Sequence, residues 1–220
     1  MKKLLSIISA LTIAGAPVLA DPKIDEWNTY HAMGCMLVQD CTEDIQQITS
    51  IRDVEKIFPE VDYTFIAPEF EALMEQLKRI GVGVYVADNK YFPRLHRGVY
   101  HTTGNNFFLN KKYMWDSNAL LEVTRHEGWH TVQDCMAGDL ENNSIAILWN
   151  DGVVPNGFRI RADIAYGGNP QVVPWEAEAF WAGDEAYQTV NALKACKNPN
   201  VDMWTTYPPT PMTGEWLIKN

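Results

Sequence analysis

The sequence lacks several features that mark large classes of proteins. Its four cysteines show no CxxC spacing, which argues against a zinc site built from cysteines alone. It has no basic cluster, and its 28 acidic residues outnumber the 18 basic ones, so the formal net charge is −10. Such an acidic chain is not expected to bind nucleic acid or anionic lipid surfaces. It also lacks an internal repeat and a second-domain boundary, so we expect one domain with a single core.

Apolar runs long enough to cross a membrane are absent after the first twenty residues. Lys2 and Lys3 precede an apolar run over residues 4–18, and the small-residue end of this run is typical of an export signal. We predict that residues 1–20 are a signal peptide, whose removal changes the net charge to −12 because it takes away Lys2 and Lys3. The mature chain, residues 21–220, is then expected to be a secreted or periplasmic domain without stable membrane association.

The four cysteines all lie in the part of the chain that is expected to be exported. Their even number in such a compartment indicates two disulfides, for which three pairings are possible. We favour Cys35–Cys41 with Cys135–Cys196, because this pairing closes one local loop and ties one helix to a later one.

Three short strands are predicted in the middle of the chain. They span residues 82–87, 98–102 and 106–109. The first is an apolar run that ends at the turn residues Asp88 and Asn89, and Gly104 lies in a turn between the other two. We therefore expect an α+β fold with a small mixed sheet of about three strands.

Helices are predicted on both sides of these strands. The expected segments are short pieces within 21–60, longer helices over 68–80, 119–136 and 175–195, and a short helix at 144–149. Gly81 is the expected end of the first long helix, and Asp116 or Ser117 is the expected cap of the second. Residues 150–174, rich in Gly, Pro and Asn, are predicted to be a long loop. Four prolines predict an extended tail from about residue 198.

The helix over 119–136 contains the segment His126-Glu127-Gly128-Trp129-His130. Residues four apart share one face of a helix, so His126 and His130 can direct two imidazoles at one zinc ion. Glu127 is about a quarter turn away, where it can reach a water on the metal without being a ligand. The chain has only five His, and HExxH is expected by chance on the order of once in a hundred such sequences. This favours Zn²⁺ chemistry over an ordinary helix with two partly buried His.

At this segment the chain resembles the zincin metallopeptidases, over about residues 69–195. The resemblance implies a zincin-like fold in which the sheet packs against the HExxH helix and a second long helix. It implies a zinc hydrolase of peptide bonds, with Glu127 as general base and a peptide or protein as substrate. It also implies an edge strand before the motif helix that pairs with extended substrate, and residues 106–110 are the matching segment.

A zinc ion needs a third protein ligand. The metzincin branch is excluded, because Gln133 and Met136 stand where its pattern has Gly and His. Glu176 and Ala179 resemble the ExxA element of glutamate zincins, in which the Glu is the ligand and the Ala lets two helices pack closely. We therefore favour Glu176 as the third ligand.

Asp163 is the alternative third ligand. With Tyr166 and Gly167 it resembles the DxxYG element of the aspartate zincins, the deuterolysin-like peptidases, although Arg161 and Ala162 replace the Gly-Thr that normally precedes the Asp. Other residues have weaker expected roles. Asp134 and Glu122 are candidate partners of the His rings but are expected to be surface acids, as is Glu178, while Trp129 is expected in the core and Tyr166 or Tyr187 is a candidate oxyanion donor.

Two other functions stay open from the sequence. One is a non-catalytic, disulfide-stabilised secreted binding protein, whose 8 Trp and 9 Tyr would line a groove. The other is a zinc hydrolase of amide bonds outside proteins, which would use the same site chemistry. No pattern in the chain predicts an oligomeric state.

Overall fold

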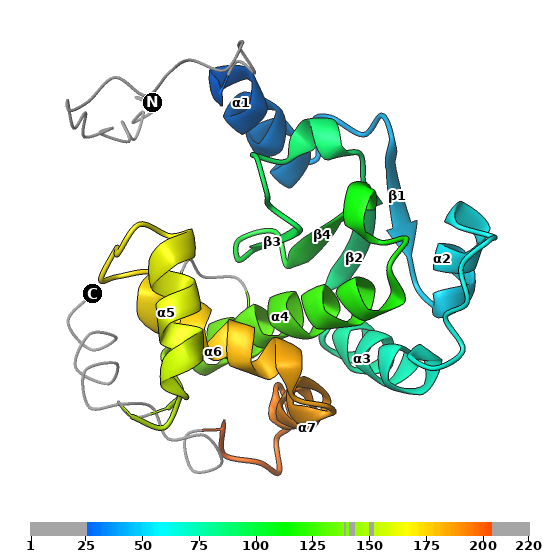
Figure 1. Cartoon of the computed structure of the whole chain (residues 1–220). Helices are drawn as coiled ribbons and strands as arrows, with labels where there is room; N and C mark the ends of the chain where they lie inside the picture. The colour runs from blue at the N-terminus through cyan, green and yellow to red at the C-terminus, as the bar shows by residue number, and fades with distance from the viewer. Residues whose placement is uncertain (1–25, 139, 141–143, 150–151, 204–220) are drawn as a thin grey trace, which may run out of the picture.

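The computed structural model describes residues 26–138, 140, 144–149 and 152–203. This part has the α+β fold that the sequence predicts, with seven α-helices and one four-stranded mixed sheet. Helix α4 (Ser117–Met136) runs through its centre. In Figure 1 the sheet lies above α4, α3 (Ala67–Ile80) and α7 (Gln188–Ala195) lie below it, and α5 (Asn156–Ala165) and α6 (Val173–Asp184) lie at its left. The predicted signal peptide and most of the predicted tail lie outside the described residues.

The sheet has the strand order β1-β2-β4-β3. Its strands are β1 (Ile45–Ile48), β2 (Gly83–Ala87), β3 (Gly98–His101) and β4 (Asn106–Asn110). β2 and β4 are parallel, whereas β1 and β3 pair antiparallel to their neighbours. The last three strands match the sequence prediction, and β1 is a strand that the sequence analysis missed.

The edge strand beside the motif helix is β3. The resemblance pointed to residues 106–110 for this role, and that expectation is wrong, since β4 is paired on both sides and all five of its residues are buried. Two Phe and a Leu in a row are typical of an interior strand that is covered on both faces. β3, in contrast, is only half-buried along its length.

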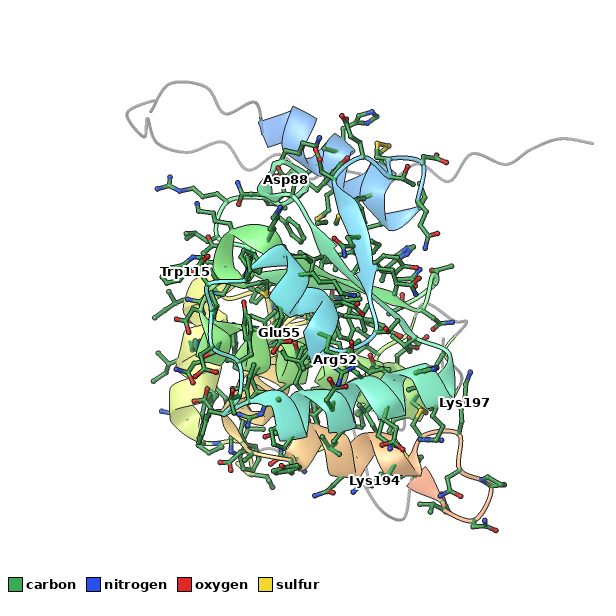
Figure 2. All side chains as sticks on the ribbon, turned by 90° about the vertical axis from the view of Figure 1, so that its right-hand side faces the viewer. Arg52, Glu55, Asp88, Trp115, Lys194 and Lys197 are labelled. Atoms are coloured by element: carbon green, nitrogen blue, oxygen red, sulfur yellow. A yellow bond between two sulfur atoms is a disulfide. The ribbon has the colours of Figure 1, made fainter. Side chains whose placement is uncertain are left out.

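Helix α3 (Ala67–Ile80) has Pro68 in its first turn and is capped by Gly81. The φ of Gly81 is left-handed, at 87°, and its N–H donates to the backbone oxygens of Leu77 and Lys78. Its apolar side chains recur every three or four residues and are buried in the main core. Figure 2 shows α3 between α2 (Ile51–Ile57) above it and α7 below it.

Helix α4 is buried on most of its circumference because it lies between the sheet and the other helices. Asp116 caps its first turn by accepting hydrogen bonds from the backbone N–H groups of Asn118 and Ala119. Trp129 has no exposed surface and stacks on Trp149, which confirms its predicted place in the core. The packing fixes the orientation of the side chains that α4 carries.

The structure corrects three predictions in the second half of the chain. The predicted loop over 150–174 contains helix α5 (Asn156–Ala165), the predicted helix at 144–149 is absent, and the predicted helix over 175–195 is two helices. These are α6 (Val173–Asp184) and α7 (Gln188–Ala195), separated by a break at which Tyr187 has a φ of 60°. Helix α5 begins after Pro155, and its inner residue Ala162 is buried in a small core with Ala177.

Both disulfides have the favoured pairing, Cys35–Cys41 and Cys135–Cys196. The second joins the end of α4 to the end of α7 across 61 residues of sequence, so it restricts the unfolded chain strongly. Two disulfides are typical of proteins from an oxidising environment, outside the cell or in the periplasm. Among the described residues, no helix has the length and apolar character that a membrane span requires.

Candidate metal centre

Three side chains from two helices converge at one buried point. His126 and His130 lie one turn apart on α4, and Glu176 lies in the first turn of α6. The two Nε2 atoms are 3.2 Å apart, and Oε2 of Glu176 is 3.3 Å from Nε2 of His126 and 3.7 Å from Nε2 of His130. The three side chains are between 9% and 13% exposed, so they face one another rather than solvent.

These separations suit a metal ion at the centre of the group. Two ligand atoms bound tetrahedrally to zinc at ordinary distances lie about 3.3 Å apart. The three measured edges of this triangle are close to that length. Oε2 of Glu176 is buried and accepts no hydrogen bond from a described residue, which is expected of a metal-ligating oxygen. The residues present therefore fit a metal ion, with one further position for a water or substrate.

Charge holds the group together. Although burial opposes a charged imidazole, the Glu176 carboxylate raises the pKa of His130 to about 9. Burial also acts against the charged form of Glu176, but His130 and His126 hold the pKa of this carboxyl well below its usual range. Glu176 is therefore an anion, which is the form that binds a cation.

Small residues let α6 approach α4 closely enough to bring Glu176 into this group. Ala179 and Ala182 on α6 have no exposed surface. A Cβ on Gly183 would lie 3.2 Å from the backbone oxygen of Glu122 on α4. The buried Ala179 agrees with the role that the ExxA resemblance gave it.

Glu127 lies next to the triangle on the side that faces β3. Its carboxyl group is buried, and this burial raises its pKa, while His126 and His130 act in the opposite direction. A Cβ on Gly98 in β3 would lie 2.5 Å from Oε1 of Glu127. The absence of a side chain at position 98 therefore leaves the space that the Glu127 carboxylate occupies.

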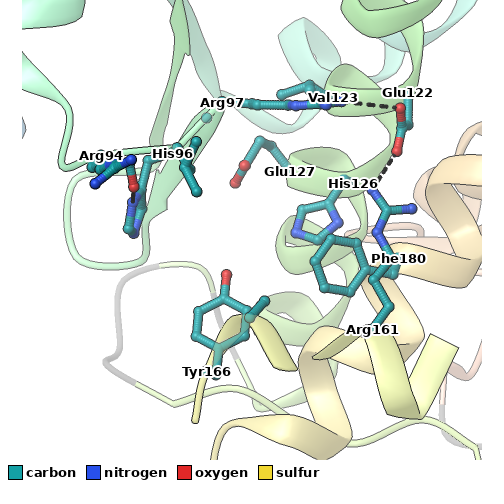
Figure 3. Close-up of a pocket in the computed structure, with 13 residues that line it drawn as sticks. Arg94, His96, Arg97, Glu122, Val123, His126, Glu127, Arg161, Tyr166 and Phe180 are labelled. Carbon is teal, nitrogen blue, oxygen red and sulfur yellow. Dashed lines mark hydrogen bonds and ion pairs between the residues drawn. The ribbon is translucent and has the colours of Figure 1, made fainter. Parts of the chain in front are cut away.

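The group opens into a cleft with a volume of about 320 Å³, within the usual range of ligand-binding pockets. Figure 3 shows Glu127 at its centre, His126 and Phe180 on one side, and Arg94 and His96 on the other. The hydroxyl group of Tyr166 points into the same space. Burial and the nearby carboxylates of Glu176 and Glu127 raise the pKa of Tyr166, so this residue remains a hydrogen-bond donor.

The outer support of the site comes from residues that the sequence analysis did not propose for it. Gln133 donates its amide N–H groups to the backbone oxygen of Trp175, at 3.0 Å, and to Oε2 of Glu178, at 2.9 Å. Since both partners are acceptors, the amide oxygen of Gln133 must face Nδ1 of His130, 2.8 Å away. Nδ1 therefore carries a proton, and when a metal ion replaces the proton on Nε2, this nitrogen faces the metal position.

Glu178 completes this support and is not the surface carboxylate that the sequence predicted. It has no exposed surface and accepts hydrogen bonds from the backbone N–H groups of Leu148 and Trp149, at 2.8 and 2.7 Å, besides those from Gln133 and the Trp129 ring. Burial raises the pKa of Glu178 to about 7, although these four donors lower it. Residues 144–149 are not helical, and two of their backbone N–H groups, those of Leu148 and Trp149, bond to Glu178 instead of to helical carbonyl groups.

A Gln133→Leu variant should bind the metal about 10- to 100-fold more weakly, because His130 loses the acceptor that fixes its ring. Competition with a coloured zinc chelator at pH 7 measures the affinity. Gln171→Leu, which changes an exposed Gln, is the matched control and should bind as the wild type does. Equal affinity of the Gln133 variant and the control, with the fold intact by circular dichroism, would contradict the support that we describe.

The other candidate residues lie away from the triangle. Asp163 is exposed on α5 and belongs to no metal-binding group among the described residues. Asp134 is buried, not a surface acid, and accepts a hydrogen bond of 2.7 Å from the Tyr100 hydroxyl. Glu122 is partly exposed and pairs with arginines in the cleft, and Tyr187 lies 45% exposed between α6 and α7.

Comparison of the chain with protein-family models, with curated proteins and with solved structures gives no match. The candidate metal centre is therefore interpreted from its own geometry.

Proposed function

We propose that this chain is a secreted or periplasmic zinc-dependent hydrolase of the zincin type that cleaves peptide bonds. The observation that carries the proposal is the triangle of His126, His130 and Glu176, whose edges match tetrahedral zinc and beside which lies the buried, non-ligating carboxylate of Glu127. Two His and one carboxylate that leave a further position are a ligand set found in catalytic zinc sites.

The three ligands, Glu127 and Tyr166 each have a role in this reaction. A zinc ion held by the three ligands would supply a Lewis acid and lower the pKa of a water toward about 7. Glu127 takes the proton of the attacking water and passes it to the leaving amine. The Tyr166 hydroxyl donates a hydrogen bond to the carbonyl oxygen as negative charge develops on it.

An extended peptide has a place to lie along β3. This strand is an edge of the sheet among the described residues, and its Gly98 lines the cleft beside Glu127. Strand addition at such an edge would place a peptide bond next to the metal position. The substrate edge is thus Gly98–His101, one strand further out than the segment that the resemblance suggested.

Metal analysis combined with a peptidase assay tests the function. The purified mature chain should hold one zinc per molecule and cleave quenched fluorescent peptides, and dipicolinate should remove both properties until zinc is added back. His126→Ala should lose the stoichiometric zinc, whereas His31→Ala, which changes an exposed His on α1 (Glu26–Leu37), should keep it. A chain that holds no zinc would contradict the proposal and favour the binding protein; a zinc-loaded chain that cleaves only non-protein amides would favour the other hydrolase.

A further inference from the structure

The cleft carries basic side chains that the proposed reaction does not use. Its lining includes Arg94, Arg97 and Arg161 but only two acidic residues, Glu122 and Glu127. The whole chain has the opposite balance, with 28 acidic and 18 basic residues. Positive charge is thus concentrated where a substrate would bind, which favours a substrate with a negative charge.

Two of these arginines already have a carboxylate partner. Glu122 on α4 lies between them, 3.4 Å from Arg97 and 2.7 Å from Arg161 (Figure 3). Each also lies over an aromatic ring, Arg97 over Tyr113 and Arg161 over Phe180. Arg161 has a second carboxylate beside it, since Oδ1 of Asp184 lies 4.0 Å from its Nη1. These contacts hold both guanidinium groups in place.

Arg94 differs from them, because its guanidinium group makes no hydrogen bond or ion pair with any residue that the structure describes. It lies on the side of the cleft opposite His126 (Figure 3). The turn that carries Arg94 is nevertheless fixed by the buried Asn110. This residue donates its side-chain N–H to the backbone oxygen of His96, at 2.8 Å, and its backbone N–H to the backbone oxygen of Arg97, at 2.8 Å. Leu95 in this turn has a left-handed φ of 71°, a conformation that a Leu adopts only where the surroundings impose it.

We propose that Arg94, the cleft arginine without a carboxylate partner among the described residues, binds a carboxylate of the substrate, so that the cleft selects acidic peptides. This inference rests on the proposed function and names its substrate class. A guanidinium group presents two parallel N–H donors that match the two oxygens of a carboxylate. The carboxylate comes either from an acidic side chain near the scissile bond or from the C-terminus of a short peptide, and the geometry serves both.

Cleavage of matched peptides tests the selectivity. The probes are quenched, amidated peptides of Ala and Phe in which one Glu occupies each position in turn, the same peptides with Gln in its place, and a Gln peptide with a free C-terminus. The zinc-loaded mature chain should show a kcat/KM at least about tenfold higher for the best carboxylate-bearing peptide than for its neutral match. In Arg94→Gln this ratio should fall close to one, and Arg94→Lys should give an intermediate ratio because it keeps charge without the fork.

The matched control is Arg52→Gln, which removes the same charge from the exposed face of α2 (Figure 2). It should keep the wild-type ratio between acidic and neutral peptides. Preference for Glu peptides identifies an acidic side chain as the ligand, and preference for the free C-terminus identifies the terminal carboxylate. Equal kcat/KM for all three kinds of peptide, or a ratio unchanged in Arg94→Gln, would overturn the proposal.

Binding measured without turnover separates this inference from the proposed function. Calorimetry with Glu127→Gln protein should give a Kd about tenfold lower for the preferred carboxylate peptide than for its neutral match, and the difference should shrink as salt is raised. If the Glu127→Gln protein shows this preference but the wild type cleaves none of the peptides, the carboxylate site is supported and the proposed peptidase function is contradicted. Cleavage without any charge preference, in rate or in Kd, would do the reverse.

Discussion

Glu127→Gln should abolish nearly all hydrolysis while leaving the metal in place. Loss of a general acid–base group typically lowers turnover by about 10²- to 10⁴-fold, and we expect a decrease of about 10³-fold in kcat. Gln has almost the same shape as Glu, so it fills the space beside Gly98 without disturbing the packing. It cannot accept the proton of the attacking water, which is the step that the proposed reaction requires.

Two measurements made on the same preparation decide this prediction. Zinc content should stay at one per chain, because Glu127 does not belong to the metal-binding group of His126, His130 and Glu176. Steady-state kinetics on a quenched peptide should show the loss in kcat rather than in KM. Glu55→Gln, an exposed change on α2 (Figure 2), serves as the control and should retain activity.

Retained activity in Glu127→Gln would remove this residue from the mechanism. The Tyr166 hydroxyl, which points into the same cleft, would then be the next candidate to test. Loss of zinc together with activity would instead show that Glu127 helps to hold the metal, which would contradict its non-ligating position.

The sequence predicted the parts of the site that depend on local geometry. His126, Glu127 and His130 lie on one helix, so helical spacing alone brings the two imidazoles together and places Glu127 beside them. The strands β2, β3 and β4 likewise follow from short apolar runs and turn residues. β1 escaped prediction because its four residues, Ile45-Gln46-Gln47-Ile48, have polar exposed centres and gain their strand structure from pairing with β2.

Features that depend on contacts distant in sequence were not predictable in this way. Glu178 can be buried because the backbone N–H groups of Leu148 and Trp149, together with side chains of α4, reach it from other parts of the chain. Gln133 entered the sequence analysis only as a departure from the metzincin pattern, and its contact with His130 depends on the side chain of Glu178 that holds its amide group. Helical spacing of three residues from His130 is the one local indication of its role.

The break between α6 and α7 has a similar origin. Residues 185–187 contain no Gly or Pro, so the sequence predicted one continuous helix. Glu69, 118 residues earlier than Tyr187, accepts a hydrogen bond of 2.6 Å from its backbone N–H. The break in the helix leaves the Tyr187 N–H without a helical acceptor, and the Glu69 carboxylate takes that place, so the chain can turn into α7 at this point.

Glu69 is therefore the residue at which we expect the largest loss of stability. It lies buried in the first turn of α3, and its two carboxylate oxygens accept hydrogen bonds from Nε and Nη2 of Arg125, at 2.8 and 2.5 Å. Arg125 also donates to the backbone oxygen of Gly183, at 3.2 Å. The ion pair between Glu69 and Arg125 thus joins α3, α4 and the start of the α6–α7 turn. Arg125 directly precedes the metal-binding residue His126 in the sequence.

Glu69→Gln should lower the free energy of unfolding by about 3–5 kcal/mol, because it leaves the buried Arg125 charge without its partner. Glu75→Gln, an exposed change on the same helix, should alter it by less than about 0.5 kcal/mol. Urea denaturation of zinc-saturated, oxidised protein followed by tryptophan fluorescence measures both. A Glu69→Gln variant within about 1 kcal/mol of the wild type would contradict the prediction, since a buried and fully paired carboxylate cannot be neutralised at so small a cost.

A double variant separates the charge from the packing. Glu69→Leu with Arg125→Met removes both charges together, so no buried charge is left unpaired, and apolar replacement of buried ion pairs is often neutral or stabilising. We expect the double variant to regain most of the stability that Glu69→Gln loses, but not all of it. The Tyr187 N–H keeps no acceptor in either Glu69→Leu or the double variant, and one unsatisfied buried donor costs about 1–3 kcal/mol. The hydrogen bond between Glu69 and Tyr187 lies at the turn that follows α6, the helix that carries Glu176. The zinc affinity of the double variant should therefore fall along with this residual loss if the turn holds α6 in place.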